Sequence, residues 1–431
     1  MASNFIEVLR WRGMIHDVMP GAEDHLMEQM RSAYVGFDPT ADSLHIGNLV
    51  PIMLLAHYQQ CGHKPFALVG GATGMIGDPS GKSTERNFLD EKTLRHNQEA
   101  IKQQLAHFLD FDNGEKNAAV LVNNYDWMKD FSFLDFIRDV GKHITVNYMM
   151  AKDSVKNRIS SESADGMSFT EFTYQLVQGY DFLHLFKAHD CTIQMGGSDQ
   201  WGNITTGTEL IRRVGNGKGF AITCPLITKS DGSKFGKSEG GNVWLDAKRT
   251  SPYKFYQYWL NSSDEDAEKY IKIFTFLEEQ EIKSLVETHT EQPHLRQLQK
   301  RLAQEITTMV HSQADFENAE KASTILYSKS FKADIQTLDE TTFLDVFEGV
   351  PTAEVSKSLL QSGLDMIAAL SAETSFLASN GEARRALKEN SISVNKEKVG
   401  EDYKISSADL INDTYVIFNR GKRSTFIIRV V

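Results

Sequence analysis

The chain of 431 residues lacks several features that would set it apart from ordinary globular proteins. Its three cysteines, Cys61, Cys191 and Cys224, lie far apart, without a Cys-x-x-Cys pair or a nearby histidine cluster. We therefore expect neither a disulfide framework nor a metal site. The sequence has no run of about 18 apolar residues, the length that a membrane span needs. Residues 1–12 carry charges among their apolar residues and do not resemble a signal peptide, so we expect a cytoplasmic protein without a membrane partner.

An excess of positive charge is also missing, because 46 Lys and Arg residues face 58 Asp and Glu residues and give a formal net charge of −12. This balance argues against a general binder of polyanions. Residues 357–431 differ from the rest, since they hold 11 basic and 9 acidic residues. The acidity thus lies in residues 1–356, and it argues against an indiscriminate nucleic-acid partner rather than against any such partner.

At roughly 150 residues per domain, the length predicts two or three domains. The hydrophobic pattern predicts a strand over residues 33–37, a helix over 45–60 and a second strand over 65–70. Strand, helix and strand within about 40 residues indicate a parallel α/β unit, whose ligands bind at the carboxyl ends of the strands. A similar unit recurs over residues 192–214, with its turn at 196–200.

The remaining segments differ in composition. Residues 91–181 are predicted to be largely helical, and so are residues 251–330, which are dense in Glu, Lys and Gln. Residues 334–352 are acidic and poorly periodic, which predicts a linker. Residues 355–431 have the pattern of a small α+β unit.

The segment His45-Ile46-Gly47-Asn48 stands at the predicted start of a helix. N–H groups at a helix start bind anions, and the side chains of His45 and Asn48 can add donors to a phosphate. Gly47 would let a flat group lie against the backbone. The same residues also fit a surface helix start capped by a preceding polar residue, and these four residues alone favour that plainer interpretation.

Two further segments carry lysines among glycines. The first, Gly77-Asp78-Pro79-Ser80-Gly81-Lys82, resembles a P-loop but has three residues between its glycines where a P-loop has four. Lys82 and Arg86 could still meet phosphate as mobile point charges. The second, Lys234-Phe235-Gly236-Lys237-Ser238, has two lysines and a hydroxyl that could close over a polyphosphate. An ordinary exposed loop has the same composition, so each segment alone leaves both interpretations open.

Taken in order, these segments resemble the class I aminoacyl-tRNA synthetases, whose two signatures are His-Ile-Gly-His and Lys-Met-Ser-Lys-Ser. Further blocks narrow the resemblance to the tyrosyl-tRNA synthetases of the bacterial type, over essentially the whole chain. These blocks begin at Tyr34, Gly77, Tyr174 and Gly196.

The resemblance implies an α/β fold: a Rossmann-like parallel-sheet catalytic domain, an α-helical anticodon-binding domain and a small α+β RNA-binding domain. The implied catalytic domain covers residues 1–228 and includes a helical insertion. A mobile lysine loop at 229–245, an anticodon-stem domain at 246–332 and a linker at 333–354 would follow. Residues 355–431 would form an RNA-binding domain of a ribosomal-protein type.

The implied reaction joins L-tyrosine to tRNA(Tyr). ATP would convert tyrosine to tyrosyl-adenylate with release of pyrophosphate, and the tyrosyl group would then pass to the 3′ end of the tRNA. Mg²⁺ would accompany ATP without a dedicated protein site, and the resemblance implies a homodimer. A tryptophanyl-tRNA synthetase and a non-catalytic RNA-binding paralogue are the alternatives. Tyr34 and Asp181 resemble the family's phenol-recognising pair, which argues against the first alternative. The presence of His45, Lys234 and Lys237 argues against the second.

The resemblance also implies roles for single residues. Those implied in catalysis would meet the phosphates or the leaving pyrophosphate: His45, Asn48, Lys82, Arg86, Lys234, Lys237 and Ser238. Those implied in tyrosine binding would meet its phenol, its ammonium group or the pocket around them: Tyr34, Asp78, Tyr174, Gln178, Asp181 and Gln194. Those implied in ATP binding are Gly36, Asp38, Thr40, His45, Gly47, Asn48, Asp199, Gln200 and Lys237.

The chain departs from the family pattern at three places. Asn48 replaces the second signature histidine, although its amide can still donate to phosphate. The side chain of Val35 cannot form a hydrogen bond with ribose. In the lysine loop, Phe235-Gly236 replaces Met-Ser but leaves both lysines in place.

Basic residues of the last segment would bind tRNA by the same resemblance. Arg384, Arg385 and Lys388 would share one helix face, beside Lys396 and Lys398 on a turn. Such a surface can follow phosphates without reading bases, although a solvated helix would carry similar charges.

Overall fold

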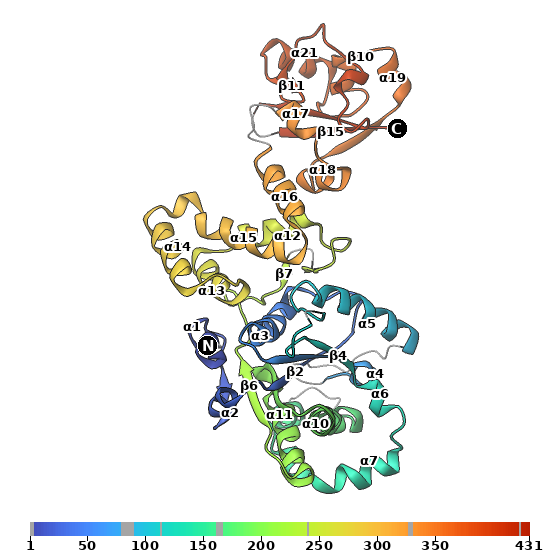
Figure 1. Ribbon diagram of the computed structural model, residues 1–431. Coiled ribbons are helices and arrows are strands. Elements are labelled where there is room, and N and C mark those ends of the chain that lie inside the picture. Colours follow the sequence, from blue (N-terminus) through green and yellow to red (C-terminus); the bar gives the residue numbers. More distant parts are fainter. Residues whose placement is uncertain are drawn as a thin grey trace. The chain divides into compact units, whose positions relative to one another are not determined.

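The structure is a computed structural model, which describes residues 4–78, 90–112, 114–160, 167–238, 241–325, 331–421 and 424–431 (Figure 1). Its contacts divide the chain into two compact units. The first comprises Met1–Thr250 and Tyr258–His311, and the second comprises Ser251–Gln257 and Ser312–Val431. None of the helices in the described ranges is long and apolar enough to cross a membrane.

The first unit is built on a six-stranded sheet with the order β1-β6-β5-β2-β3-β4. All neighbouring strands are parallel except β1, which pairs antiparallel with β6. The strands are β1 (Asp17–Val18), β2 (Ser32–Phe37), β3 (Lys64–Val69), β4 (Val120–Asn123), β5 (Cys191–Gly197) and β6 (Phe220–Cys224). The strand order changes direction between β2 and β5, and in open α/β sheets ligands bind beyond the carboxyl ends of the strands at such a point.

Helices cover both faces of this sheet. Figure 1 shows α3 on one face and α10 and α11 on the other. The alternation along β2 explains this, because Tyr34 packs with Phe182 of α10 in one apolar cluster while its neighbours point the other way. The helices are α1 (Phe5–Trp11), α2 (Ala22–Glu28), α3 (Leu49–Gln60), α4 (Gly71–Ile76), α5 (Glu91–Leu105), α6 (Tyr125–Met128), α7 (Phe133–Asp139), α8 (Val146–Met150), α9 (Asp153–Ser160), α10 (Phe169–His189) and α11 (Trp201–Leu210).

The later part of the first unit is helical. It follows a small hairpin and contains α13 (Asp264–Phe274), α14 (Glu279–Glu291) and α15 (Gln297–Val310). The hairpin strands are β7 (Lys237–Ser238) and β8 (Gly241–Asn242). Helix α12 (Pro252–Leu260) lies in the second unit up to Gln257 and in the first from Tyr258.

The second unit contains a five-stranded sheet with the order β12-β11-β14-β15-β9. Apolar side chains on one face of this sheet pack with α21 in one cluster. Those on the other face pack with α17 and α18 in a second cluster. The strands are β9 (Thr352–Val355), β11 (Ile392–Val394), β12 (Glu397–Lys398), β14 (Tyr415–Arg420) and β15 (Ser424–Val430), with a separate pair β10 (Leu364–Asp365) and β13 (Lys404–Ile405). The helices are α16 (Gln313–Ile325), α17 (Phe331–Ile335), α18 (Glu340–Val346), α19 (Lys357–Gln361), α20 (Met366–Leu370) and α21 (Asn380–Lys388).

The predicted α/β fold class is confirmed, and both predicted strand-helix-strand units are present. The first difference is β4, a four-residue strand inside the segment 91–181 that was expected to be largely helical. So short a run carries little periodic signal, and its pairing with β3 decides its conformation. The expected turn at 196–200 also begins later, because Gly196 and Gly197 continue β5 beside β6.

The segment 334–352 is not the linker that its composition predicted. It contains α18, whose Phe343 is fully buried and stacks on Tyr415 with ring centroids 4.7 Å apart. This segment belongs to the second compact unit, whose longer part is Ser312–Val431. Acidic residues on the exposed side of α18 concealed the apolar face that packs on the sheet.

Replacement of Phe343 by Ala is expected to lower the free energy of unfolding of the second unit by about 3 kcal/mol, because it leaves a cavity in the core. The neighbouring Leu344 is 49% exposed, so Leu344→Ala should change that free energy by about 0.5 kcal/mol or less. Urea unfolding of both variants measures the difference. Equal effects of the two substitutions would show that α18 is not packed as described.

Candidate active site

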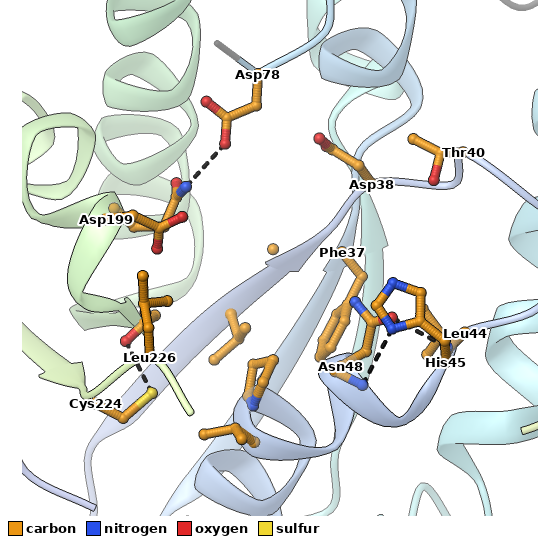
Figure 2. Close-up of a pocket in the computed structure, with 18 of the residues that line it drawn as sticks. Phe37, Asp38, Thr40, Leu44, His45, Asn48, Asp78, Asp199, Cys224 and Leu226 are labelled. Carbon is orange, nitrogen blue, oxygen red and sulfur yellow. Dashed lines mark hydrogen bonds between the residues drawn. The ribbon is translucent and has the colours of Figure 1, made fainter. Parts of the chain in front are cut away.

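A pocket of about 670 Å³ opens beyond the carboxyl ends of β2 and β5. Figure 2 shows Asp78 and Asp199 on one side of it and His45 and Asn48 on the other. The structure brings most of the sequence-predicted site residues together on its walls. These are Tyr34, Gly36, Asp38, Thr40, His45, Gly47, Asn48, Asp78, Tyr174, Gln178, Asp181, Gln194, Asp199, Gln200 and Lys234.

The deep end of the pocket contains a phenol and a carboxylate that are both 1% exposed, Tyr34 on β2 and Asp181 on α10. The hydroxyl of Tyr34 has no hydrogen-bond partner within the described part of the chain. Burial raises the pKa of Tyr34 well above its usual value, and the charge of Asp181 adds to this. A buried hydroxyl without a partner costs free energy, so this end is shaped for a ligand that supplies a polar group.

Two donors hold the carboxylate of Asp181. Asn124 Nδ2 donates to Oδ2 at 2.9 Å, and Trp127 Nε1 donates to Oδ1 at 2.8 Å. Burial raises the pKa of Asp181 to about 7, and these two hydrogen bonds oppose the rise. The carboxylate is thus oriented, and its raised pKa lies near neutral pH.

No sequence motif indicated Asn124 or Trp127, because both follow β4, a strand too short to be predicted from its periodicity. Asn124 is fully buried, and its Nδ2 also lies 3.1 Å from Thr73 Oγ1, which donates to Asp38 Oδ1 at 3.2 Å. The one available signal was the pair of asparagines at 123–124 directly after an apolar run. A polar pair at the end of a buried strand marks the ligand edge of a parallel sheet.

A chain of side-chain amides lines the neighbouring wall. Asn203 Nδ2 donates to Gln178 Oε1 at 3.0 Å, and Gln178 Nε2 donates to Gln200 Oε1 at 3.3 Å. Gln200 Nε2 then donates to Asp78 Oδ2 at 2.8 Å. These bonds fix which way each amide points. The last of them ends on the carboxylate of Asp78, which can bind a cation. Asn203 ends the sequence block that begins at Gly196, although no role was predicted for it.

The predicted phosphate turn differs from its expected form. His45 precedes a 3₁₀ turn at Ile46–Asn48, and regular helix begins only at Leu49. The N–H groups of the turn are paired inside the protein: Ile46 with Val243 O, Gly47 with His45 Nδ1, and Asn48 with His45 O. These N–H groups are thus already paired in this structure, and the donors that the turn can offer to a phosphate are the side chains of His45 and Asn48.

Both side chains of the turn are oriented by its backbone. His45 Nδ1 accepts from Gly47 N at 3.1 Å, so a neutral His45 carries its proton on Nε2. Asn48 Oδ1 accepts from His45 N at 3.1 Å, which points its acceptor at the backbone and leaves the NH₂ group as the outward donor. Asn48 thus keeps donor chemistry at the position of the signature histidine.

Residues 243–245, which follow the segment Lys234–Ser238, pair with the backbone beside this turn. Ile46 N donates to Val243 O and Leu245 N donates to Leu44 O, each at 2.9 Å. Lys234 lines the pocket, whereas Lys237 is exposed on β7 and is not part of the lining. Residues 79–89, which include Lys82 and Arg86, lie outside the described residues, and so does the side chain of Ser238.

The comparisons with known proteins agree with this geometry. The family model for class I tRNA synthetases (W and Y) matches residues 27–328, and the model for a tyrosine–tRNA ligase C-terminal domain matches residues 342–428. The chain belongs to the class I tRNA synthetases of the W and Y type.

Two sequence relatives cover 99% of this synthetase, and a relative of known structure covers a smaller part. The tyrosine–tRNA ligase of Flavobacterium johnsoniae is 63% identical over 430 residues, which is 99% of this chain and 100% of the relative. That of Porphyromonas gingivalis strain W83 is 62% identical over 428 residues, with coverage of 99% and 100%. The crystal structure of a truncated Aspergillus nidulans mitochondrial tyrosyl-tRNA synthetase is 32% identical with a TM-score of 0.66, over 75% of this chain and 94% of that chain.

The basic residues predicted to bind tRNA lie in the second unit of the synthetase. Arg384, Arg385 and Lys388 are exposed on α21, and Lys396 and Lys398 are exposed at the turn between β11 and β12. Arg384 also lies 3.6 Å from Glu401, an exposed pair that contributes little to stability. The structure thus brings the predicted cations to the surface of one unit.

Gly47→Ala is expected to displace the His45 ring, because a Cβ at this position would lie 2.8 Å from its Cε1 atom. Because the half-buried ring can move, the free energy of unfolding of the first unit should fall by about 1 kcal/mol in a urea titration, through loss of the hydrogen bond from Gly47 N to His45 Nδ1. Gly36→Ala is the matched control in the same pocket, since its nearest neighbour there would be 4.0 Å away. An equal effect of the two substitutions would contradict the described turn.

Proposed function

We propose that this synthetase activates L-tyrosine with ATP and transfers the tyrosyl group to the 3′ end of tRNA(Tyr). The deep end of the pocket carries the proposal. It offers the hydroxyl of Tyr34, which has no hydrogen-bond partner among the described residues, beside the oriented carboxylate of Asp181. A phenol both donates and accepts, so one tyrosine hydroxyl would satisfy both groups at once. The full-length relatives at 60 to 63% identity are named tyrosine–tRNA ligases, which supports the same substrates.

The other end of tyrosine would meet the amide wall. Asp78 carries the charge that attracts the ammonium group, and Gln178 and Tyr174 line the same part of the pocket. Asp199 would bind the ribose of ATP beside Gln200, and Asp38 and Thr40 would separate the nucleotide from the amino acid. This arrangement would hold the tyrosine carboxylate towards the His45 side of the pocket.

The first chemical step needs no general base, because a carboxylate is already a nucleophile at pH 7. It attacks the α-phosphorus of ATP, the bond to the β-phosphate oxygen breaks, and pyrophosphate leaves with the negative charge. The residues therefore act by positioning and by stabilising that charge. His45 Nε2–H, the Asn48 NH₂ group and Lys234 are the described donors, and Lys82, Arg86, Lys237 and Ser238 complete the proposed set. Mg²⁺ would arrive bound to the phosphates of ATP and neutralise part of their charge.

The second step needs the acceptor end of tRNA(Tyr) at the same pocket. The exposed cations of α21 and of the β11–β12 turn would hold another part of the same tRNA through its phosphates. We place this chemistry in the cytoplasm, which suits three free, buried cysteines.

We further propose that the synthetase forms a homodimer through the described part of residues 133–169. This segment exposes an unusual number of large apolar side chains, and scattered single ones would need no explanation. They are Phe133, Leu134, Ile137, Val146, Met150, Ile159 and Phe169.

Asp181→Asn tests the proposed substrate. The variant should lower kcat/KM for tyrosine in ATP–pyrophosphate exchange by about 10- to 100-fold, because the phenol loses its charged acceptor. As the pH falls from 8 to 6, the KM for tyrosine in the unmodified chain should rise by about tenfold, since Asp181 with a pKa of about 7 becomes protonated. In Asp181→Asn this rise should disappear. A rise of the same size in the variant would assign the titration to another group.

Leu134→Asp tests the proposed dimer. Leu134 is 76% exposed, so burial at an interface would make a charge there costly and the variant should sediment as a monomer. Met27→Asp is the control, because Met27 is 60% exposed outside this segment and its replacement should leave the dimer intact. Sedimentation of both variants as dimers would place the interface elsewhere.

A further inference from the structure

Phe235 stands between the two lysines of the loop and packs among four aromatic side chains. Its ring is stacked on Phe274 with centroids 5.3 Å apart and planes at 7°. Tyr270, Trp259 and Tyr258 surround it at 5.1, 6.0 and 6.3 Å. We call these four side chains the aromatic box. Tilted and offset ring pairs at such distances are favourable, so the ring of Phe235 has a defined seat.

The aromatic box itself is closely packed. Trp259, Tyr270 and Phe274 are at most 2% exposed. Their rings also contact one another, with centroids 5.3 Å apart for Trp259 and Phe274 and 5.8 Å apart for Tyr270 and Phe274. A buried cluster of this kind resists rearrangement because a displaced ring would leave a cavity. The seat of Phe235 is therefore part of the core.

The helix that carries half of the box is held at its carboxyl end by Arg12. The guanidinium donates to Lys272 O at 2.7 Å, to Thr275 O at 2.8 Å and to Leu277 O at 2.9 Å. Burial lowers the pKa of Arg12 to about 10, so the group stays charged at neutral pH. A cation at these carbonyls satisfies the end of α13 and fixes it to the amino-terminal segment.

The residue after Phe235 is fixed from the opposite side. Gly236 has φ +92°, its N–H donates to Tyr258 Oη at 3.3 Å, and its carbonyl accepts from Val243 N at 3.1 Å. A Cβ on Gly236 would lie 3.4 Å from Gly47 N, so this backbone packs directly on the phosphate turn. Phe235 and Gly236 thus form an anchored pair with a lysine beside each end.

We propose that Phe235 is a positioning residue for adenylate formation, whose seat in the aromatic box fixes the point from which Lys234 and Lys237 reach the phosphates. The inference rests on the proposed function. Because the lysines would meet charge that grows on the leaving pyrophosphate, displacement of the ring should slow the chemical step rather than weaken tyrosine binding. If the ring only stabilised the fold, its displacement would not slow the chemical step while leaving tyrosine binding unchanged.

Phe235→Ala tests this in single-turnover formation of tyrosyl-adenylate, with tyrosine affinity measured by equilibrium dialysis. The rate constant should fall about tenfold or more, and the Kd for tyrosine should stay unchanged. Phe235→Met should retain the rate within about threefold, because a thioether packs well against aromatic rings. Phe276→Ala is the matched control, since Phe276 contacts His57 and not the box, and it should leave the rate unchanged. Loss of rate in Phe276→Ala, or an equal loss of tyrosine affinity in Phe235→Ala, would overturn the inference.

A double variant separates positioning from general loosening. If Phe235 acts through Lys237, then Phe235→Ala should cost less than about threefold in a Lys237→Ala background. Additive losses would overturn the inference. Full activity of Phe235→Ala would overturn it as well, and the proposed function would stand. Absence of tyrosine-dependent exchange in the unmodified chain would overturn the proposed function itself.

Discussion

The buried carboxylate of Asp181 is the constraint on which the pocket depends. A charged group that is 1% exposed is costly unless donors hold it, and here they come from Asn124 and Trp127. Both donors follow β4, the strand that lies beyond β3 at the edge of the sheet. The carboxylate of Asp181 is therefore held in its orientation only when β4, α6 and α10 are all folded. A ligand phenol would then enter a site that is already oriented.

The side of the pocket that would meet the phosphates depends on a different interaction. Backbone hydrogen bonds join the turn at His45 to residues 243–245. The N–H group of Ile46 is used in this pairing, and those of Gly47 and Asn48 are paired with His45. The side chains of His45 and Asn48 are therefore the donors that the turn can offer. The backbone pairing also places Gly236 against Gly47. Two segments about 190 residues apart in the sequence thus form one surface, which explains why neither is informative alone.

Most of the pocket residues could be predicted because they lie in sequence blocks that resemble those of the tyrosyl-tRNA synthetases. The convergence of parallel strands accounts only for the residues that follow β2 and β5. What could not be predicted depends on tertiary contacts. Asn124 and Trp127 gain their role only through the position of β4, and Asn203 gains its role only through Gln178. The same holds for α18, whose acidic face suggested a linker, and for the aromatic box around Phe235, whose members are spread from residue 258 to residue 274.

The central claim is that the unpaired Tyr34 hydroxyl and the Asp181 carboxylate select a phenol. ATP–pyrophosphate exchange by the unmodified chain, with tyrosine, phenylalanine and tryptophan compared at pH 8, tests this most directly. Phenylalanine would leave both buried groups without a partner, so kcat/KM for tyrosine should exceed that for phenylalanine by about a hundredfold or more. Tryptophan should support no measurable exchange. Equal use of tyrosine and phenylalanine, or exchange driven by tryptophan, would contradict the account.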